Sequence, residues 1–426
     1  NTRISEEPLI DPKRIMELLG FFAELAERFS PSSTLSEFTI EELEVNPLQI
    51  KDGKAVALDG LLKFSRDKHQ LGRKNQNNIK RLLYPQSVLM IGASASRQNM
   101  GRQILKNLSR SGDRIRKENI LALHPDPEVN QIEGVKAVSS LDEIDNKMDL
   151  AVITVPASDT LVEMIERIVR EELASSLILI SAGFDETEKG AGYSERLRQT
   201  LRERKDLSES CPVINGPNCM GVVSGPGGYN TFFLPDYKIS YAGKYGKNAA
   251  FISQSGAFVV TMKNILTRID PAYQITVGNQ IDLTVTDYLD TIGEEANIDT
   301  FFLYLEGFKR LGGRRFLETA RRLIGAGKKI IAYKAGRTSE GAKAVASHTA
   351  AMAGDYFVFK KLLIQEGILI TETLDEFEDC MKIFSMLAGK VPAGNRVGII
   401  SDAGYECSSA SDLLGRLELA SFSEDT

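Results

Sequence analysis

Short apolar runs alternate with helical stretches along the chain from residue 87 onward. The first series has runs suited to buried parallel strands at 88–91, 120–123, 150–155, 177–181 and 213–214. The clearest helical stretch between them is 159–172, where apolar residues recur on one face at helical spacing. Parallel strands joined by helices form a doubly wound sheet, so the fold class that we predict is α/β.

A second series of the same kind follows residues 224–247, which are rich in Gly, Pro and Tyr and indicate a domain boundary. We expect its strands at 249–253, 274–277, 300–305, 329–334 and 368–370, and its last helix at 374–388. After a linker at 391–395, a strand at 396–401 and a helix at 405–417 begin another unit. One strand and one helix cannot form a stable domain, so we expect the chain to stop inside this unit.

The N-terminal segment predicts a helix followed by a β-hairpin. The helix is expected over 11–29, where Asp11 can cap it. The hairpin strands are expected at 41–50 and 54–62, joined by a turn at Asp52-Gly53. A polar and basic stretch then indicates a linker plus a helix over 63–84.

The register of this hairpin brings three oxygen-bearing side chains together. A two-residue turn pairs Lys51 with Lys54 and therefore places Asn46 opposite Asp59. Glu44 alternates onto the same face as Asn46. Such hard oxygen ligands suit Mg²⁺, although a polar face turned to solvent explains them equally well.

Length, charge and cysteine usage limit the classes of protein that this chain can represent. Its 426 residues give a soft prior of about three domains. The 52 Lys and Arg against 58 Asp and Glu give a net charge of −6, which excludes a basic nucleic-acid footprint over the whole chain. No apolar run is long enough to predict a membrane span. The four cysteines form no Cys-x-x-Cys pair, so we expect no zinc site, no disulfide framework and a cytoplasmic location.

The first motif that could carry chemistry is the turn Gly92-Ala93-Ser94, directly after an apolar run and before a helix that contains Gly101. A glycine-rich turn of this kind can present backbone N–H groups and a helix N-terminus to a phosphate. The ligand could be a dinucleotide or another phosphorylated cofactor. Equally, the glycine could serve a tight turn alone.

Two further motifs follow later strands. Gly216-Pro217-Asn218-Cys219-Met220-Gly221 predicts a rigid loop, which alone would be no more than a turn. Ser253-Gln254-Ser255-Gly256 stands between a strand and a helix. It could form an anion cradle at the helix start, or Ser255 could merely cap the helix.

A histidine lies in a stretch of small residues after the expected strand 329–334. We expect residues 336–354 to form a long loop in which His348 can be reached and can move. An imidazole can act as a nucleophile and carry a phosphoryl group if a carboxylate orients it. Glu306, at the end of the expected strand 300–305, is the candidate carboxylate, because carboxyl ends of parallel strands meet at one rim of the sheet. Otherwise Glu306 would be an ordinary surface residue.

The order of these motifs resembles the NDP-forming acyl-CoA synthetase family, which is related to succinyl-CoA synthetase. The resemblance covers nearly the whole chain. The matching motifs are Gly-Ala-Ser at 92–94, Gly-Pro-Asn-Cys at 216–219, Ser-Gln-Ser-Gly at 253–256, Val-Gly-Asn-Gln at 277–280, Leu-Tyr-Leu-Glu at 303–306, Ser-His-Thr at 347–349 and Glu-Val-Asn-Pro at 44–47. One departure is Ala350, where the family usually has glycine after the His-Thr pair.

The resemblance implies a division into domains. It places the C-terminal fragment of an ATP-grasp domain at 1–65, a linker at 66–84, a Rossmann-like CoA-binding domain at 85–223, a flavodoxin-like ligase domain at 224–390 and the start of a second ligase domain at 391–426. Most of the ATP-grasp domain is then missing from this sequence. The remainder would belong to the same polypeptide or to another chain.

The resemblance also implies roles for individual residues. The phosphorylated catalytic residue is His348, oriented by Glu306. The implied phosphate-binding residues are Ser253, Ser255, Gly256 and Asn218. The implied CoA-binding residues are Gly92, Ala93, Ser94, Pro125 and Pro156. The implied Mg²⁺ ligands are Asn46, Asp59 and Glu44.

The implied reaction interconverts acyl-CoA, ADP and phosphate with an acid, ATP and CoA, through an acyl phosphate and a phosphohistidine. The implied partners are a small-molecule acid or acyl-CoA, the rest of the ATP-grasp domain and further copies of the chain, without nucleic acid or membrane. Two alternatives remain at this point. A CoA-binding regulatory module is disfavoured by the presence of His348, and an NAD-dependent dehydrogenase is disfavoured by the absence of the Gly-x-Gly-x-x-Gly fingerprint.

Overall fold

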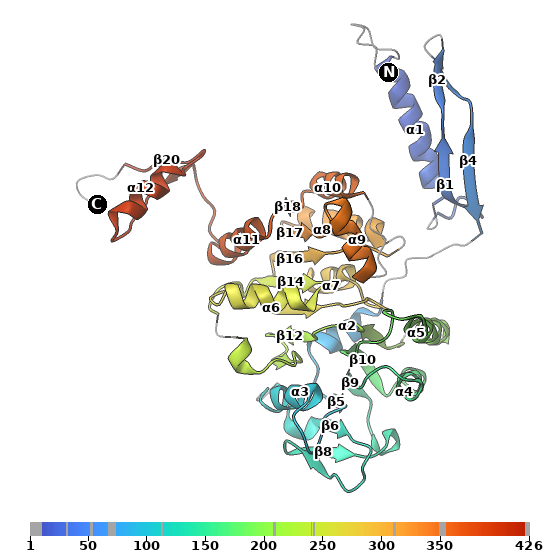
Figure 1. The fold of residues 1–426 in the computed structure, drawn as a ribbon, viewed down its shortest axis with the longest axis vertical. Coiled ribbons are helices and arrows are strands. Elements are labelled where there is room, and N and C mark those ends of the chain that lie inside the picture. Colours follow the sequence, from blue (N-terminus) through green and yellow to red (C-terminus); the bar gives the residue numbers. More distant parts are fainter. Residues whose placement is uncertain are drawn as a thin grey trace.

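The computed structural model describes residues 11–30, 33–51, 54–66, 74–111, 114–207, 210–239, 241, 243–309, 312–348 and 355–421. For residues 206, 236 and 344–348 it describes the backbone only. Within these ranges two seven-stranded sheets, each covered by helices, form the body of the molecule (Figure 1). We call the body, residues 74–390, the two-sheet unit, and we call residues 11–66 the N-terminal unit.

The first sheet has the strand order β11-β10-β9-β5-β6-β8-β7 and is parallel except for β7 at its edge. Its strands are β5 Val88–Ile91, β6 Ile120–Leu123, β7 Gln131–Ile132, β8 Val135–Val138, β9 Met148–Ile153, β10 Ala174–Leu179 and β11 Val213–Asn215. Its helices are α3 Met100–Ser109, α4 Asp159–Arg170 and α5 Glu188–Leu207, with short 3₁₀ turns η1 Lys117–Asn119 and η2 Leu141–Glu143. The order reverses between β5 and β9, as in doubly wound sheets.

The second sheet has the order β13-β12-β15-β14-β16-β17-β18. Its parallel strands are β14 Ala249–Ser253, β15 Tyr273–Thr276, β16 Thr300–Leu305, β17 Lys329–Lys334 and β18 Leu369–Thr371, and the antiparallel edge is β12 Val222–Ser224 and β13 Tyr229–Asn230. Its helices are α6 Gly256–Ile265, α7 Val285–Ile292, α8 Gly312–Gly325, α9 Ser339–His348, α10 Tyr356–Gln365 and α11 Leu374–Met386, with the 3₁₀ turn η3 Asp236–Lys238.

The sequence predicts five strands in each series correctly and misses the parallel strand β8, which pairs with β6, and the antiparallel strands β7, β12 and β13. All five strands expected in each series are present, within a few residues of their expected bounds. The segment expected as a boundary, 224–247, instead supplies β13 and part of β12 to the second sheet. These strands have only two and three residues, too few for a periodic pattern to reveal.

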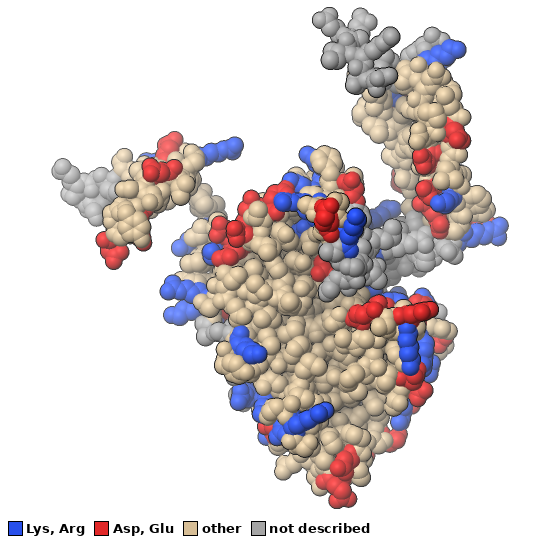
Figure 2. Space-filling model, viewed as in Figure 1, with Lys and Arg blue, Asp and Glu red and all other residues tan. Residues whose placement is uncertain are grey.

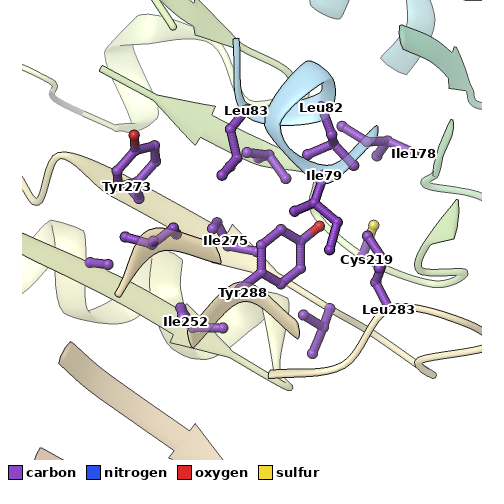
Figure 3. Close-up of a cluster of buried hydrophobic side chains, with 14 of the residues drawn as sticks. Ile79, Leu82, Leu83, Ile178, Cys219, Ile252, Tyr273, Ile275, Leu283 and Tyr288 are labelled. Atoms are coloured by element: carbon purple, nitrogen blue, oxygen red, sulfur yellow. The ribbon is translucent and has the colours of Figure 1, made fainter. Parts of the chain in front are cut away.

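Helix α2, Gln76–Leu83, joins the two sheets into one core. Asn75 caps it by accepting hydrogen bonds from the N–H groups of Asn77 and Asn78. Three of its side chains, Ile79, Leu82 and Leu83, are fully buried. They belong to a single apolar cluster that contains residues of both sheets, such as Ile178 and Ile275 (Figure 3). The helix expected after the basic linker is therefore the element on which both sheets pack.

The N-terminal unit comprises α1 Pro12–Arg28 and the hairpin strands β1 Thr39–Val45, β2 Leu48–Lys51, β3 Lys54–Ala57 and β4 Gly60–Ser65. It stands apart from the two sheets in Figure 1. At the other end of the chain, β19 Arg396–Val397 pairs in parallel with β20 Glu418–Leu419, and α12 Gly404–Asp412 connects them. Both segments match the expected helix–hairpin and strand–helix order.

Acidic and basic side chains are mixed over the face shown in Figure 2. The four cysteines are free thiols. Among the described residues, no helix combines the length and the apolar character needed to cross a bilayer.

Candidate active site at the junction of the two sheets

Gly92 follows β5 in a conformation that suits only glycine, with φ of +101°. A Cβ atom added there would lie 2.6 Å from Thr154 Oγ1 and 2.9 Å from Val155 Cγ2. The turn also lies against the start of α3, because a Cβ on Gly101 would lie 2.5 Å from the Gly92 carbonyl oxygen. The tight-turn explanation of Gly92 is therefore correct, whatever ligand the turn binds, and a larger residue here would disturb the fold itself.

Asn99 holds this turn against α3. Its side-chain oxygen accepts hydrogen bonds from the N–H groups of Arg102, at 2.9 Å, and Ser94, at 3.2 Å. Its side-chain nitrogen donates to the Gly92 carbonyl oxygen at 2.8 Å. The Ser94 hydroxyl oxygen accepts from the Arg97 N–H at 3.2 Å. The backbone at the start of α3 is thus ordered by side chains of the loop itself.

The three positions expected to bind CoA at strand ends lie at the same edge of the first sheet. Gly92, Pro125 and Pro156 follow β5, β6 and β9, which are neighbours in the order β9-β5-β6. Pro125 and Pro156 are exposed, whereas Ala93 is buried. Ligands of doubly wound sheets bind at such carboxyl edges, next to the point where the strand order reverses.

The Gly216–Gly221 loop forms a rigid corner after β11. Gly216 and Asn218 both have positive φ, of +98° and +54°. The Asn218 N–H donates to the Ser181 carbonyl oxygen at 2.9 Å. Cys219 donates its thiol proton to the Leu179 carbonyl oxygen at 3.3 Å, and burial raises its pKa to about 12. Cys219 is therefore a neutral thiol at physiological pH rather than a nucleophile.

A loop of the second sheet, residues 277–280, docks on this corner through backbone contacts. The Asn279 N–H donates to the Pro217 carbonyl oxygen at 2.9 Å. A Cβ on Gly278 would lie 2.1 Å from the same oxygen, so only glycine permits this approach. Gly278 and Asn279 belong to the Val-Gly-Asn-Gln motif, but we did not predict them as site residues, because nothing in the sequence places the two loops in contact.

The docked loops enclose one side of a cavity of about 320 Å³ between the two sheets. Its lining residues are Met100, Ile180, Ala182, Asn218, Cys219, Met220, Phe233, Gln254, Ser255, Gly256, Ala257, Gly278 and Asn279. None of these side chains carries a charge. The structure thus brings three predicted phosphate-binding residues, Asn218, Ser255 and Gly256, to one cavity, and Ser253 lies fully buried behind them.

Ser253 and Ser255 shape the start of α6. The Ser253 hydroxyl donates to the Ser255 carbonyl oxygen at 2.6 Å and accepts from the Ser255 N–H at 3.0 Å. Ser255 caps α6 by accepting from the Phe258 N–H at 3.4 Å. Gly256 lies close to Met220, whose Cγ would be 2.2 Å from an added Cβ. The capping role is therefore real, and it leaves the helix N-terminus, where anions bind favourably, facing the cavity.

Glu306 follows β16 and lies beside the end of β14. The residue is 5% exposed, so it is not an ordinary surface glutamate. Its negative charge, after burial itself, contributes to raising the pKa of Tyr304 to about 12. A carboxylate therefore stands at the rim of the second sheet, close to the residues that precede α6.

The expected loop at 336–354 is wrong over most of its length, because α9 spans Ser339–His348. Alanine, the strongest helix former, occurs at three positions between 342 and 346. The Thr338 hydroxyl accepts from the Gly341 N–H at 3.1 Å near the first turn. His348 is the last residue of this helix, and its side chain lies outside the description, as do residues 349–354.

The hairpin has the predicted register. Lys51 pairs with Lys54, and the Asn46 N–H donates to the Asp59 carbonyl oxygen at 3.1 Å. The Asn46 side-chain amide also donates to Glu44 Oε1 at 3.2 Å. The turn residues Asp52-Gly53 lie outside the described residues.

The hairpin side chains of Glu44, Asn46 and Asp59 offer two carboxylates and one amide. This set suits Mg²⁺ only if other ligands complete the coordination of the ion. Among the described residues, no group of three His, Cys, Asp or Glu side chains is placed to hold a metal ion. Mg²⁺ is commonly held by one or two carboxylates plus substrate phosphates, and Glu44, Asn46 and Asp59 fit that arrangement.

Comparison with known proteins identifies the family. The CoA binding domain model matches residues 86–224, and the succinyl-CoA ligase like flavodoxin domain model matches residues 246–384. The subunit alpha of the ADP-forming acetate–CoA ligase II of Pyrococcus furiosus is 33% identical over 355 residues, which cover 80% of this chain and 70% of that protein. The ADP-forming acetate–CoA ligase II of Archaeoglobus fulgidus is 30% identical over 98% of this chain and 58% of its own length.

A solved structure is also similar, with 28% identity and a TM-score of 0.67 over 82% of this chain and 71% of the other. It is the dinucleotide forming acetyl-coenzyme A synthetase 1 of Ca. Korarchaeum cryptofilum, in complex with phosphate and ADP. The chain therefore belongs to the family of ADP-forming acyl-CoA synthetases, which are ligases. The family prediction from the sequence motifs is confirmed, and the chain spans little more than half of the A. fulgidus relative.

Proposed function

We propose that this chain carries the acyl-transfer and phosphohistidine steps of an ADP-forming acyl-CoA synthetase. The observation that carries the proposal is the shared cavity, where Asn218 of the first sheet faces Ser255 and Gly256 of the second. CoA would bind the first sheet at Gly92, Ala93, Ser94, Pro125 and Pro156. Its thioester would then reach the cavity from the adjacent edge of that sheet.

The first step would exchange the thioester for an acyl phosphate. A phosphate oxygen attacks the thioester carbonyl carbon, and the carbon–sulfur bond breaks to release the CoA thiolate. Asn218 and the N-terminus of α6 would hold the phosphate. The lining supports this role, because it includes no carboxylate that would repel a phosphate and it includes the N-terminal residues of α6.

The second step would move the phosphoryl group to His348. A ring nitrogen of His348 attacks phosphorus, and the bond to the acyl oxygen breaks to release the free acid. Glu306 would accept a hydrogen bond from the other ring nitrogen and so fix the orientation of the ring. Ser255 and Gly256 would then stabilise the phosphohistidine at the start of α6, on a turn that the buried Ser253 holds through its hydrogen bonds to Ser255.

The last step would pass the phosphoryl group to ADP bound by the N-terminal unit together with the rest of an ATP-grasp domain, in the same or another chain. Asn46 and Asp59, with Glu44 nearby, would hold Mg²⁺, which when bound offsets the negative charge of the nucleotide phosphates. The P. furiosus relative is named as a subunit alpha, which supports a partner chain. We further propose a homo-oligomer in the cytoplasm, where the four free cysteines would stay reduced.

Labelling with ³²P-acetyl phosphate tests the proposal. The protein should acquire a label that acid removes and alkali does not. His348→Asn should abolish it and Glu306→Gln should slow it. His124→Asn is the matched control and should keep the label. Persistence of the label in His348→Asn would contradict the proposal and favour a regulatory CoA-binding module.

A further inference from the structure

Two buried polar side chains form hydrogen bonds with the main chain at Glu306, one from each side. Gln254 follows β14 and Lys334 ends β17, and these two strands flank β16, which leads into Glu306. Each of the two residues is only 4% exposed. Buried amide and ammonium groups are costly unless they are hydrogen-bonded, so their partners indicate what they stabilise.

Both polar atoms of the Gln254 side-chain amide form hydrogen bonds with this segment. Its Oε1 accepts hydrogen bonds from the N–H groups of Glu306 and, at 3.1 Å, Gly307. Its Nε2 donates to the Gly307 carbonyl oxygen at 2.7 Å. The Gln254 N–H donates to the Tyr304 carbonyl oxygen at 3.1 Å. The side chain therefore continues the ladder between β14 and β16 beyond the point where the two backbones separate.

Lys334 binds the same peptide from the other side. Its Nζ donates to the Glu306 carbonyl oxygen at 2.8 Å and to the carbonyl oxygen of Ala335. Burial lowers the pKa of Lys334, and the negative charge of Glu306 opposes this shift. The N–H and the C=O of Glu306 are thus both fixed by side chains, while the regular strand pairing ends one residue earlier, at Leu305 with Lys334.

We propose that Gln254 and Lys334 are positioning residues that fix the Glu306 carboxylate relative to the N-terminus of α6. This inference rests on the proposed function, because the carboxylate must be held in place only if it orients a reacting histidine. A displacement of about 1 Å at a catalytic group can cost about 100-fold in rate, so a segment that carries such a group needs rigid support.

The test measures the rate of acid-labile labelling of the full chain by ³²P-acetyl phosphate. Gln254→Met and Lys334→Met remove the hydrogen-bonding groups and nearly conserve volume. We expect each to lower the saturating rate by about 10- to 100-fold with little change in the half-saturating concentration of acetyl phosphate. In the Glu306→Gln background the same substitutions should cost much less, because they act through a carboxylate that is already absent.

The control is Lys263→Met, which removes an equally buried lysine bonded to Asp270 in the same domain. It should lower the melting temperature without changing the labelling rate, and if Lys334→Met does not fold, Gln254→Met decides alone. Variants that label at the unsubstituted rate, or effects that add fully to Glu306→Gln, would overturn the positioning role. Failure of the unsubstituted chain to label would instead overturn the proposed function.

Discussion

Helix α1 of the N-terminal unit and helix α2 between the two sheets both carry apolar residues at helical spacing. The apolar residues of α2 are buried in the described structure, whereas those of α1 are not. In α2, Ile79, Leu82 and Leu83 are fully buried. In α1 no residue is buried, and Ile15 and Leu19, which lie on its apolar face, are 44% and 59% exposed. A helical apolar stripe thus predicts which face would be covered, but not whether the described chain covers it. The strand-end motifs of the two-sheet unit are held in place by a buried apolar core. The positions of Asn46 and Asp59, in contrast, are set only by the backbone pairing of an exposed hairpin.

The largest effect that separates the two regions should be on stability. Leu82→Ala should lower the free energy of unfolding by about 2–5 kcal/mol, because it leaves a cavity where both sheets meet. Leu19→Ala, the matched change on α1, should alter it by less than about 0.5 kcal/mol. Chemical denaturation of both variants checks this. Similar losses in the two would show that α1 is covered as well as α2.

A charge in the first strand-end turn should weaken CoA binding next. Ser94→Asp can still accept the hydrogen bond from the Arg97 N–H, but it adds a negative charge where we place the CoA phosphates. We expect at least about a tenfold loss of affinity by isothermal titration, given the Coulomb energy of like charges near a protein surface. Ser94→Asn keeps the acceptor without the charge and should bind nearly normally. Equal CoA affinities of the two variants would show that the CoA phosphates do not bind at this turn.

A smaller effect concerns Lys309, whose Nζ donates to the Gln280 carbonyl oxygen at 2.6 Å beside the docked loop. Burial, followed by the charge of Arg198, lowers its pKa to about 8. An unfolded lysine titrates near 10.4, so between about pH 8 and 10.4 the unfolded state binds more protons. Lys309 therefore contributes a rise in stability with pH across this window. Lys309→Met should flatten the rise in thermal melts, and parallel pH curves for the two proteins would contradict the lowered pKa of Lys309.

Much of the fold could be predicted from the sequence, because strands that are buried on both faces consist of continuous apolar residues. The bounds expected for 249–253, 300–305 and 329–334 coincide with β14, β16 and β17. Helix α9 was missed because its small residues were interpreted as a loop, although alanine favours helix. The edge strands β7 and β13 were missed because two residues show no period.

The site was predictable in its parts and not in its assembly. Asn218 and Ser255 are recognisable as strand-end residues, yet their common cavity depends on the docking of Gly278 against Pro217. That contact is made by backbone atoms of two loops far apart in the sequence, and no periodic pattern encodes it. The hydrogen bonds of Gln254 and Lys334 to the main chain of Glu306 were missed for the same reason. Tertiary packing determines which group a buried polar side chain bonds to.

The central claim is a division of labour, in which the two-sheet unit carries the chemistry as far as phosphohistidine and the N-terminal unit serves only the nucleotide step. The most direct measurement is the initial rate of acid-labile labelling by acetyl phosphate, without nucleotide, in the full chain carrying both Asn46→Ala and Asp59→Asn. We predict the same rate as in the unsubstituted chain, with the label on His348. A folded double variant whose labelling falls to the level of His348→Asn would contradict the division.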